Sequence, residues 1–194
     1  PTLRRVTPTA VRLLPADADR ADWLAARRDG IGSSDVAAIL GVSDYATALH
    51  VWHDKRGALP DEHSEAALWG TLLEDPVARE WQRRNRSVVT RVGLVAHVEH
   101  LWRRATLDRR VGECPLANPP VDPSIPHREY CALEVKCRSA FKAARWRSDV
   151  PDDVLAQVTW QMHVTGWNHI HVAVLIGGND YHQTTVHRDQ ALED

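Results

Sequence analysis

The spacing of apolar positions predicts that the first half of the chain is helical. Apolar residues recur at helical spacing throughout residues 65–84. Shorter helices are predicted at residues 21–28, within 30–43 and at 47–56, because capping residues precede the last two and glycines follow them. Residues 58–64 are expected to form a loop, so four helices and their connections account for this half.

After residue 85 the pattern changes to one that is typical of strands. The stretches SVVTRV, GLVAHVEH and RRATLDRRV alternate apolar and polar residues, as in a meander. A strand YCALEVKC, a helix over residues 151–165 that begins at Pro151 and ends at Gly166, and two strands around the turn GGND follow. This order predicts an α/β (α+β) fold with a mixed β-sheet flanked by helices.

At 194 residues, the chain is expected to be a single domain over 1–194, with residues 1–20 as an irregular lead-in. Residues 113–128 are expected to form a proline-rich loop to which we assign no role. A hydrophobic content of 43% is ordinary for a globular protein. There is no run long enough to cross a membrane and no apolar leader, so we expect a cytoplasmic protein. The net charge of −2 neither favours nor excludes a polyanionic partner.

The cysteines, histidines and tryptophans are expected to be structural or exposed. The three cysteines form no CxxC pair, which indicates reduced thiols rather than a disulfide framework, a zinc site or an iron–sulfur site. Most histidines, including the pairs His97/His100 and His169/His171, are expected at the surface because they form no HExxH motif and have no cysteine partners. Four tryptophans have core-like helical spacing: Trp52, Trp69, Trp81 and Trp160.

The stretch CALEVKCRSA contains one of only three lysines among 24 basic residues. In a strand, the side chains of Leu133, Val135 and Cys137 point to one face, and those of Glu134 and Lys136 point to the other. Alone, a glutamate followed two residues later by a lysine is typical of a weak, exposed ion pair. The surrounding sequence favours a second interpretation.

Asp108 lies in the preceding strand candidate, 26 residues before Glu134. Two carboxylates on neighbouring strands with a lysine beside one of them suit the chemistry of phosphodiester hydrolysis. The oxygen ligands bind Mg²⁺, with Mn²⁺ as a substitute, and the ion produces the nucleophile and neutralises charge on phosphorus. Lysine supplies a compact ammonium group that the planar fork of arginine does not replace.

The chain resembles the YqaJ-like viral recombinase or lambda exonuclease family, within the PD-(D/E)xK nuclease superfamily. The resemblance is carried by five blocks in the family's order, over most of residues 23–189: WLAARRDGIGSSDVAAILGVSDYATALHVW, LWGTLLEDPVARE, ATLDRR, LEVKCRSA and AQVTWQMHVTG. It implies a restriction-endonuclease-like core. One departure is Leu107, where the family commonly has a proline before the aspartate.

The resemblance also implies roles for individual residues. Asp108 and Glu134 are expected to bind the metal together with the backbone carbonyl of Val135, and Glu74 to contribute to the site. Lys136 is expected to align or activate the attacking water.

The resemblance further implies that Gln157 helps to place the lysine or the water, and that Arg27 and Ser34 bind the 5′-terminal phosphate of the strand being digested. Each assignment has a simpler alternative. Gln157 is otherwise an amide at the edge of the core, Ser34 a helix N-cap, and Arg27 a solvated helix residue with Arg28 as the phosphate contact. Glu74 is otherwise an ordinary surface glutamate, although Pro76 predicts a kink or a break near it.

The resulting hypothesis is a metal-dependent DNA exonuclease of phage or prophage recombination that digests duplex DNA from its ends in the 5′→3′ direction. The family implies a single-strand annealing protein as a partner and a homo-oligomer, as in the trimer of lambda exonuclease. Two alternatives stay open: a module that binds DNA ends without cleaving them, and a structure-specific or restriction-like endonuclease.

Overall fold

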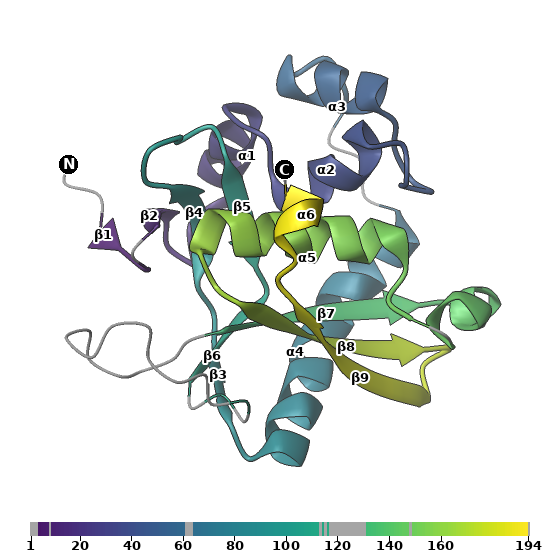
Figure 1. The fold of residues 1–194 in the computed structure, drawn as a ribbon. Helices are drawn as coiled ribbons and strands as arrows, with labels where there is room; N and C mark the ends of the chain where they lie inside the picture. Colours follow the sequence, from purple (N-terminus) through teal and green to yellow (C-terminus); the bar gives the residue numbers. More distant parts are fainter. Residues whose placement is uncertain are drawn as a thin grey trace, which may run out of the picture.

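The computed structural model describes residues 4–7, 9–60, 64–112, 114, 116, 131–147 and 149–193 (Figure 1). Its helices are α1 (Arg20–Arg28), α2 (Ser33–Ile39), α3 (Ala48–Lys55), α4 (Glu65–Asn85), α5 (Asp152–Thr165) and α6 (Gln190–Glu193), with a 3₁₀ helix η1 (Ala140–Trp146). Within these residues no helix has both the length and the apolar character needed to cross a membrane.

The strands form two sheets. The first has the order β1-β2-β4-β5 and the second the order β3-β6-β7-β8-β9. Their bounds are β1 (Arg4–Arg5), β2 (Ala10–Leu14), β3 (Val88–Thr90), β4 (Gly93–His97), β5 (Arg104–Leu107), β6 (Arg109–Gly112), β7 (Cys131–Arg138), β8 (His169–Ile176) and β9 (Asp180–His187). In the second sheet β7 and β8 are parallel and the other neighbours are antiparallel. The predicted mixed sheet is therefore confirmed.

Helices α4 and α5 cover opposite faces of the second sheet, as Figure 1 shows. On the α5 face, Ala132 of β7 and Ile170 of β8 pack with Val154 and Val158. On the α4 face, Leu133 of β7 packs with helix residues that include Val77, Ala78 and Trp81. Strand β7 is therefore buried between two helices, and its successive residues point into two separate cores.

Most helices begin and end close to the positions that their capping residues predicted. Thr47 accepts a hydrogen bond from the backbone N–H of His50, as an N-cap does. Gly166 ends α5 with φ at 72°, a conformation that favours glycine. Helix α4 does not break at Pro76 but continues through it. Gly32 is the N-cap of α2, where a serine or aspartate was expected.

Three other expectations are wrong. The lead-in is not irregular throughout, because β2 pairs with β4 and buries Ala10 and Val11. The expected meander is divided between the two sheets, since β3 pairs with β6 whereas β4 pairs with β2 and β5. Trp52 and Trp69 are more than half exposed, while Trp81 is buried as predicted. Most of the expected loop 113–128 lies outside the described residues.

Candidate active site

The carboxylate of Glu134 is buried and surrounded by hydrogen-bond donors. The residue is only 1% exposed. One carboxylate oxygen accepts from the ammonium group of Lys136 and, at 2.6 Å, from Nε2 of Gln157. The other accepts from Nε2 of Gln161 at 2.7 Å. The interpretation of Glu134 and Lys136 as an exposed ion pair is therefore wrong, because this face of β7 is covered by α5.

Gln157 links the glutamate and the lysine. Its amide oxygen accepts from Nζ of Lys136 at 2.8 Å, while its nitrogen donates to Glu134. Both polar ends of the amide are thus used, which fixes its orientation. The structure places Gln157 in direct contact with both residues, where it can hold the lysine in position.

Asp108 lies at the point where the chain passes from β5 in the first sheet to β6 in the second. Its Oδ2 accepts the backbone N–H of Val135 at 2.7 Å. The last residue pair between β6 and β7 is Arg109 with Leu133, so the edge of β7 beyond Leu133 is open to Asp108. Beside Val135, the side chain of Asp108 therefore accepts the backbone hydrogen bond that a neighbouring strand would otherwise accept.

The electrostatic environment of Asp108 disfavours its charged form. Burial raises the pKa of this carboxyl well above its ordinary value, and the negative charges of Glu134 and Glu74 raise it further. The charge of Lys136 and the hydrogen bond from Val135 act in the opposite direction without cancelling the rise. Three carboxyl groups therefore concentrate negative charge at this point.

Arg109 is a site residue that the sequence analysis missed. Its side chain is 3% exposed, and its guanidinium donates to Glu74, to Asp75 at 3.2 Å and to the backbone carbonyl of Asp108 at 2.6 Å. It therefore fixes the middle of α4 to the start of β6 and directs Glu74 toward Asp108. Its position directly after Asp108 was the available signal.

Gln161 was also missed. It is fully buried and donates both to Glu134 and, at 3.1 Å, to the backbone carbonyl of Thr106 in β5. It lies four residues after Gln157, so both amides are on the same face of α5. That spacing was the signal in the sequence.

Arg27 and Ser34 are brought together, as predicted. Nη2 of Arg27 donates to Oγ of Ser34 at 3.2 Å and contacts Oδ1 of Asp35 at 3.3 Å. A cavity of about 90 Å³ is lined by both residues and also by Asp108 and Gln157. Arg28, the alternative phosphate contact, does not line this cavity.

The segment between α1 and α2 is fixed against the start of β5. The backbone N–H of Ile31 donates to the carbonyl of Trp102 at 2.7 Å, and that of Arg104 donates to the carbonyl of Ile31 at 2.9 Å. Any side chain at residue 30 would collide with the carbonyl of Trp102, so the close approach requires Gly30. These contacts hold Arg27 beside the sheet that ends at Asp108.

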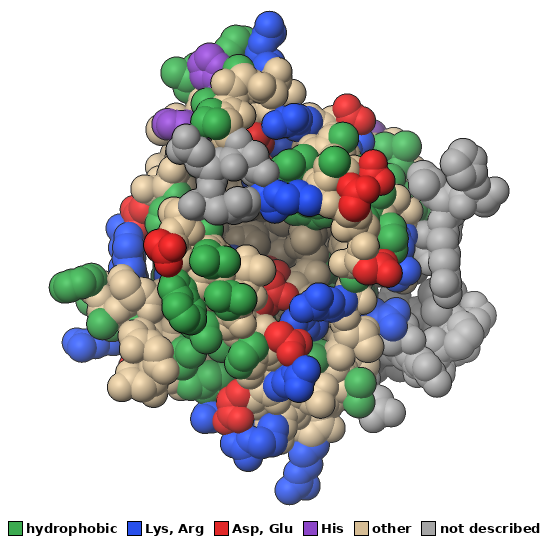
Figure 2. Space-filling view, turned by 180° about the vertical axis from the view of Figure 1, so that it is seen from behind, with side chains coloured by type: hydrophobic (Ala, Val, Ile, Leu, Met, Phe, Trp, Pro, Cys, Tyr) green, Lys and Arg blue, Asp and Glu red, His purple; other side chains and the backbone are tan. Residues whose placement is uncertain are grey.

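A larger groove of about 470 Å³ opens on the other side of Asp108. Its lining includes Thr71 and Glu74 of α4, together with Arg20, Arg91 and Arg109. The face of the molecule shown in Figure 2 is hollowed near its centre, and acidic and basic side chains both lie around the hollow. Such a combination suits a polyanion. The basic side chains can contact its charged backbone, and a bound metal ion can neutralise the carboxylates.

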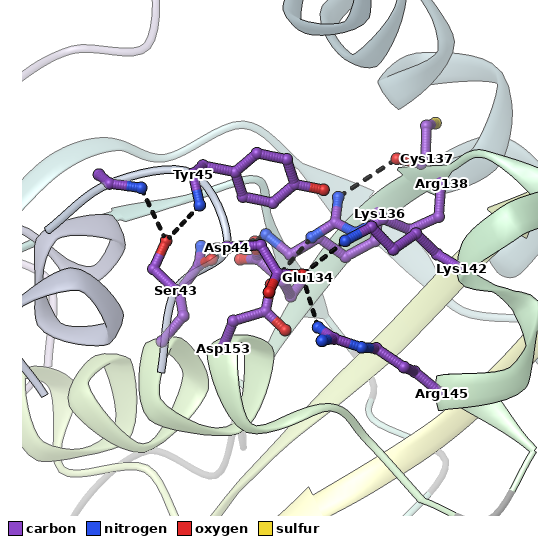
Figure 3. Close-up of polar contacts among 12 residues, drawn as sticks. Ser43, Asp44, Tyr45, Glu134, Lys136, Cys137, Arg138, Lys142, Arg145 and Asp153 are labelled. Atoms are coloured by element: carbon purple, nitrogen blue, oxygen red, sulfur yellow. Dashed lines mark hydrogen bonds and ion pairs between the residues drawn. The ribbon is translucent and has the colours of Figure 1, made fainter. Parts of the chain in front are cut away.

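A further group of basic residues lies at the end of β7. Figure 3 shows Lys142 and Arg145 on one side of Asp44, and each donates to its carboxylate at 2.5 Å. Hydrogen bonds and the neighbouring cations lower the pKa of Asp44, with the bond from Lys142 as the main cause. The loop between α2 and α3 is thereby fixed to η1 near Glu134 and Lys136.

Two histidines contradict the expectation that they lie at the surface without cysteine partners, whereas the cysteines are free thiols as expected. His169 and His171 are buried rather than exposed, and Sγ of Cys114 lies 3.0 Å and 3.2 Å from their Nε2 atoms. Cys131 completes the group. The cysteines and histidines are far apart in sequence, and only the pairing of β6, β7 and β8 brings them together.

A mixed sheet between helices, carboxylates at the junction of two strands and a lysine two residues after the second carboxylate agree with the restriction-endonuclease-like core that the sequence resemblance implied. The family model for the YqaJ-like viral recombinase domain matches residues 22–168. The chain therefore belongs to this family.

The chain is similar to the uncharacterized protein YqaJ of Bacillus subtilis, with 34% identity over 185 residues. This match covers 92% of the chain but only 53% of that relative, so the chain spans about half the length of the curated relative. The fold is similar to that of the alkaline exonuclease LHK-Exo from Laribacter hongkongensis, with a TM-score of 0.68, 22% identity and coverage of 89% and 84% of the two chains. The structure of LHK-Exo in complex with dAMP gives the same TM-score at 20% identity, over 89% and 85% of the two chains.

Proposed function

We propose that this chain is a metal-dependent DNA exonuclease that hydrolyses phosphodiester bonds of linear duplex DNA in the 5′→3′ direction. The observation that carries the proposal is the network of Asp108, Glu134, Lys136 and Gln157 beside the cavity that extends to Arg27. A general DNA-binding module has no need for a buried glutamate, a lysine and an aspartate in this arrangement. LHK-Exo, which has a similar fold, is an alkaline exonuclease that was also solved in complex with dAMP, and this is consistent with the proposal.

The residues present fit a hard divalent cation. Asp108, Glu134, the backbone carbonyl of Val135 and Glu74 would hold Mg²⁺ or Mn²⁺ through oxygen atoms, the ligands that these ions prefer. Burial is the main cause of the raised pKa of Asp108, and the charges of Glu134 and Glu74 add to it; a bound cation would offset both effects. When bound, the ion would supply a reactive water at neutral pH and stabilise charge on the phosphate.

Lys136 would act on the water or on a phosphate oxygen. Its side chain is 13% exposed, and Glu134 and Gln157 accept two of the three N–H bonds of its ammonium group, which leaves the third for a water or a phosphate oxygen. Gln157 would keep the ammonium group in one position, and Gln161 would do the same for Glu134. A fixed donor at the reacting phosphate stabilises the transition state without reorganisation during the reaction.

Arg27 and Ser34 would bind the 5′-terminal phosphate. The side chain of Arg27 is one-third exposed, and its guanidinium lies against the ring of Trp23 and donates to Oγ of Ser34. A terminal phosphate carries more negative charge than an internal phosphodiester, so charge-assisted hydrogen bonds favour it. A terminal phosphate bound there would fix how far the end of the strand lies from the phosphodiester bond placed at Asp108.

Duplex DNA ends are the proposed substrate. By resemblance to the family, we also propose a single-strand annealing protein as a partner and a homo-oligomer, with a trimer as the first possibility to test.

The deciding experiment compares linear duplex DNA, labelled at its 5′ or 3′ ends, with covalently closed circular DNA of the same sequence. We expect Mg²⁺-dependent release of nucleotides from the linear DNA only. Activity removed by EDTA should return on addition of Mg²⁺ alone. Cleavage of the circle would favour the endonuclease, and Mg²⁺-independent binding of ends without cleavage would favour the end-binding module.

A further inference from the structure

A second cluster of metal-ligating side chains lies apart from the proposed catalytic residues. One ligand atom from each of Cys114, Cys131, His169 and His171 lies within 4.8 Å of all the others. Three of these residues are buried and Cys114 is half-buried. Among the residues that the structure describes, this is the only group of three or more histidine, cysteine, aspartate or glutamate side chains whose ligand atoms lie so close together.

The positions of the four residues follow from the second sheet. Cys131 is the first residue of β7 and is paired with Val111 of β6. Leu133 of β7 is paired with His171 of β8, so the beginnings of these parallel strands lie side by side. Cys114 lies just after the end of β6, at the same edge of the sheet.

The cluster and the pair of Glu134 and Lys136 lie on opposite faces of this sheet. Cys131 packs with Leu133, Val135 and Trp81 on the side of α4. Glu134 points to α5. Because neighbouring residues of a strand alternate between faces, the two sites share β7 without sharing a ligand.

We propose that Cys114, Cys131, His169 and His171 bind one zinc ion with a structural role. Around a tetrahedral zinc with sulfur ligands at about 2.3 Å and nitrogen ligands at about 2.0–2.1 Å, ligand atoms are roughly 3.3–3.8 Å apart. The observed group is compatible with that size after small adjustments. Two sulfur and two nitrogen ligands are a set that selects zinc over Mg²⁺ or Ca²⁺.

The summed charge of the ion and its four ligands, and the hydrogen-bond partner of His171, suit zinc. Two thiolates and two neutral imidazoles around Zn²⁺ give a net charge of zero, which is favourable in a buried site. Nδ1 of His171 lies 2.9 Å from Oγ1 of Thr185. A hydrogen bond from Nδ1 to the threonine leaves the lone pair of Nε2 for the metal, as at many zinc sites.

All four coordination positions are filled by protein, which indicates a structural ion rather than a catalytic one. The ion would tie the residue after β6 to the first residues of β7 and β8. Glu134 follows Cys131 by three residues on the same strand, so the ion would also fix the start of the strand that carries the catalytic pair.

The first test is the metal content of the protein, measured by mass spectrometry after expression with Zn²⁺ and gel filtration in metal-free buffer. We expect about one zinc per chain in the wild type and a large loss in Cys114→Ser and His171→Gln. Cys137→Ser and His182→Gln are matched controls, because Cys137 lies on the same strand and His182 is exposed on β9, both outside the cluster. Thr185→Val should weaken zinc binding about 10–100-fold while all four ligands are retained.

A second measurement uses only the folded wild type, so it does not depend on whether the variants fold. Replacement of zinc by Co²⁺ should give intense visible bands of a tetrahedral ion and thiolate-to-cobalt charge transfer, and removal of the metal should lower the Tm. Wild type without bound metal, or zinc that is retained equally in Cys114→Ser, would overturn the proposal. A Cys114–Cys131 disulfide, seen as one reactive thiol instead of three, would also overturn it. None of these readouts requires nuclease activity, so they are independent of the proposed function.

Discussion

The amide of Gln161 connects Glu134 of the second sheet with the carbonyl of Thr106 in the first, at 2.7 Å and 3.1 Å. Helix α5 thereby contacts both sheets next to the point where Asp108 joins them. The side chain is fully buried, so neither acceptor can exchange this hydrogen bond for one to water.

Gln161→Leu should destabilise the protein by about 1–3 kcal/mol, because it leaves a buried charged oxygen and a carbonyl without their donor. It should also slow cleavage, since Glu134 loses one of the contacts that orient it. Urea unfolding and a nuclease assay measure the two effects. Gln183→Leu is the control: its hydrogen bonds are exposed, so a change of less than about 0.5 kcal/mol is expected. Equal effects of the two substitutions would contradict the role of Gln161.

Lys136→Ala should reduce the rate of cleavage by at least about 100-fold while DNA binding remains nearly unchanged, because the lysine is proposed to act in the transition state. Single-turnover cleavage and a binding assay without Mg²⁺ separate the two quantities. Lys136→Arg keeps the charge but not the compact ammonium group, so it should also remain strongly impaired. Near wild-type cleavage by Lys136→Ala would refute the mechanism.

The raised pKa of Asp108 predicts how stability depends on pH when Mg²⁺ is absent. A carboxyl whose pKa is higher in the folded state than in the unfolded state lowers stability as pH rises above its ordinary value. Asp108→Asn removes this effect, so the variant should have the higher Tm at pH 7, and the difference should shrink as the pH falls toward 4. Thermal unfolding across this range in Mg²⁺-free buffer measures it.

Mg²⁺ should reverse the order of stability of the wild type and Asp108→Asn. The ion should raise the Tm of the wild type at pH 7–8 and leave that of Asp108→Asn unchanged, because the amide is a much poorer ligand than the carboxylate. Binding should strengthen with pH, since the carboxyl must lose its proton to bind the ion. A pH-independent affinity for Mg²⁺ would show that Asp108 is not among the ligands.

Arg27→Ala should slow digestion of 5′-phosphorylated duplex much more than that of 5′-hydroxyl duplex, by roughly 10-fold or more. The reason is that the cavity lined by Arg27 and Ser34 is proposed to hold the terminal phosphate. Initial rates on the two substrates, for wild type and variant, provide the measurement.

Arg28→Ala is the matched control for this experiment. Arg28 is the neighbouring residue of α1 but does not line the cavity, so its replacement should leave the preference for a 5′-phosphate intact. Equal losses on both substrates in Arg27→Ala would make Arg27 a structural residue, consistent with its contact to the buried Asp35. A wild type without any preference would remove the proposed phosphate pocket.

Local patterns in the sequence were sufficient where an element has one clear periodicity. Helix α5 was predicted nearly to the residue, the two strands around the turn GGND are present, and the strand with Glu134 and Lys136 was predicted with the correct alternation of faces. Helix α5 also shows the limit of such patterns. Gln157 was recognised from the family motif, whereas Gln161 has a similar role that depends on contacts with two sheets.

What the sequence did not reveal depends on long-range pairing. Strand β2 is short and is stabilised by β4, more than 80 residues away, so its own pattern is weak. The break at Asp108 separates two sheets although the surrounding pattern is continuous. The cluster of Cys114, Cys131, His169 and His171 lacks the close spacing of a familiar zinc motif, because strand pairing rather than a local turn places its ligands.

Strand β7 is the middle strand of its sheet and is covered by a helix on each face. The backbone amides of such a strand exchange with solvent only when the whole domain opens. The amides around Glu134 and Lys136 should therefore be among the slowest to exchange deuterium. For this chain, the catalytic pair should therefore be lost only when the whole domain unfolds. In any molecule that is still folded, this strand should be intact.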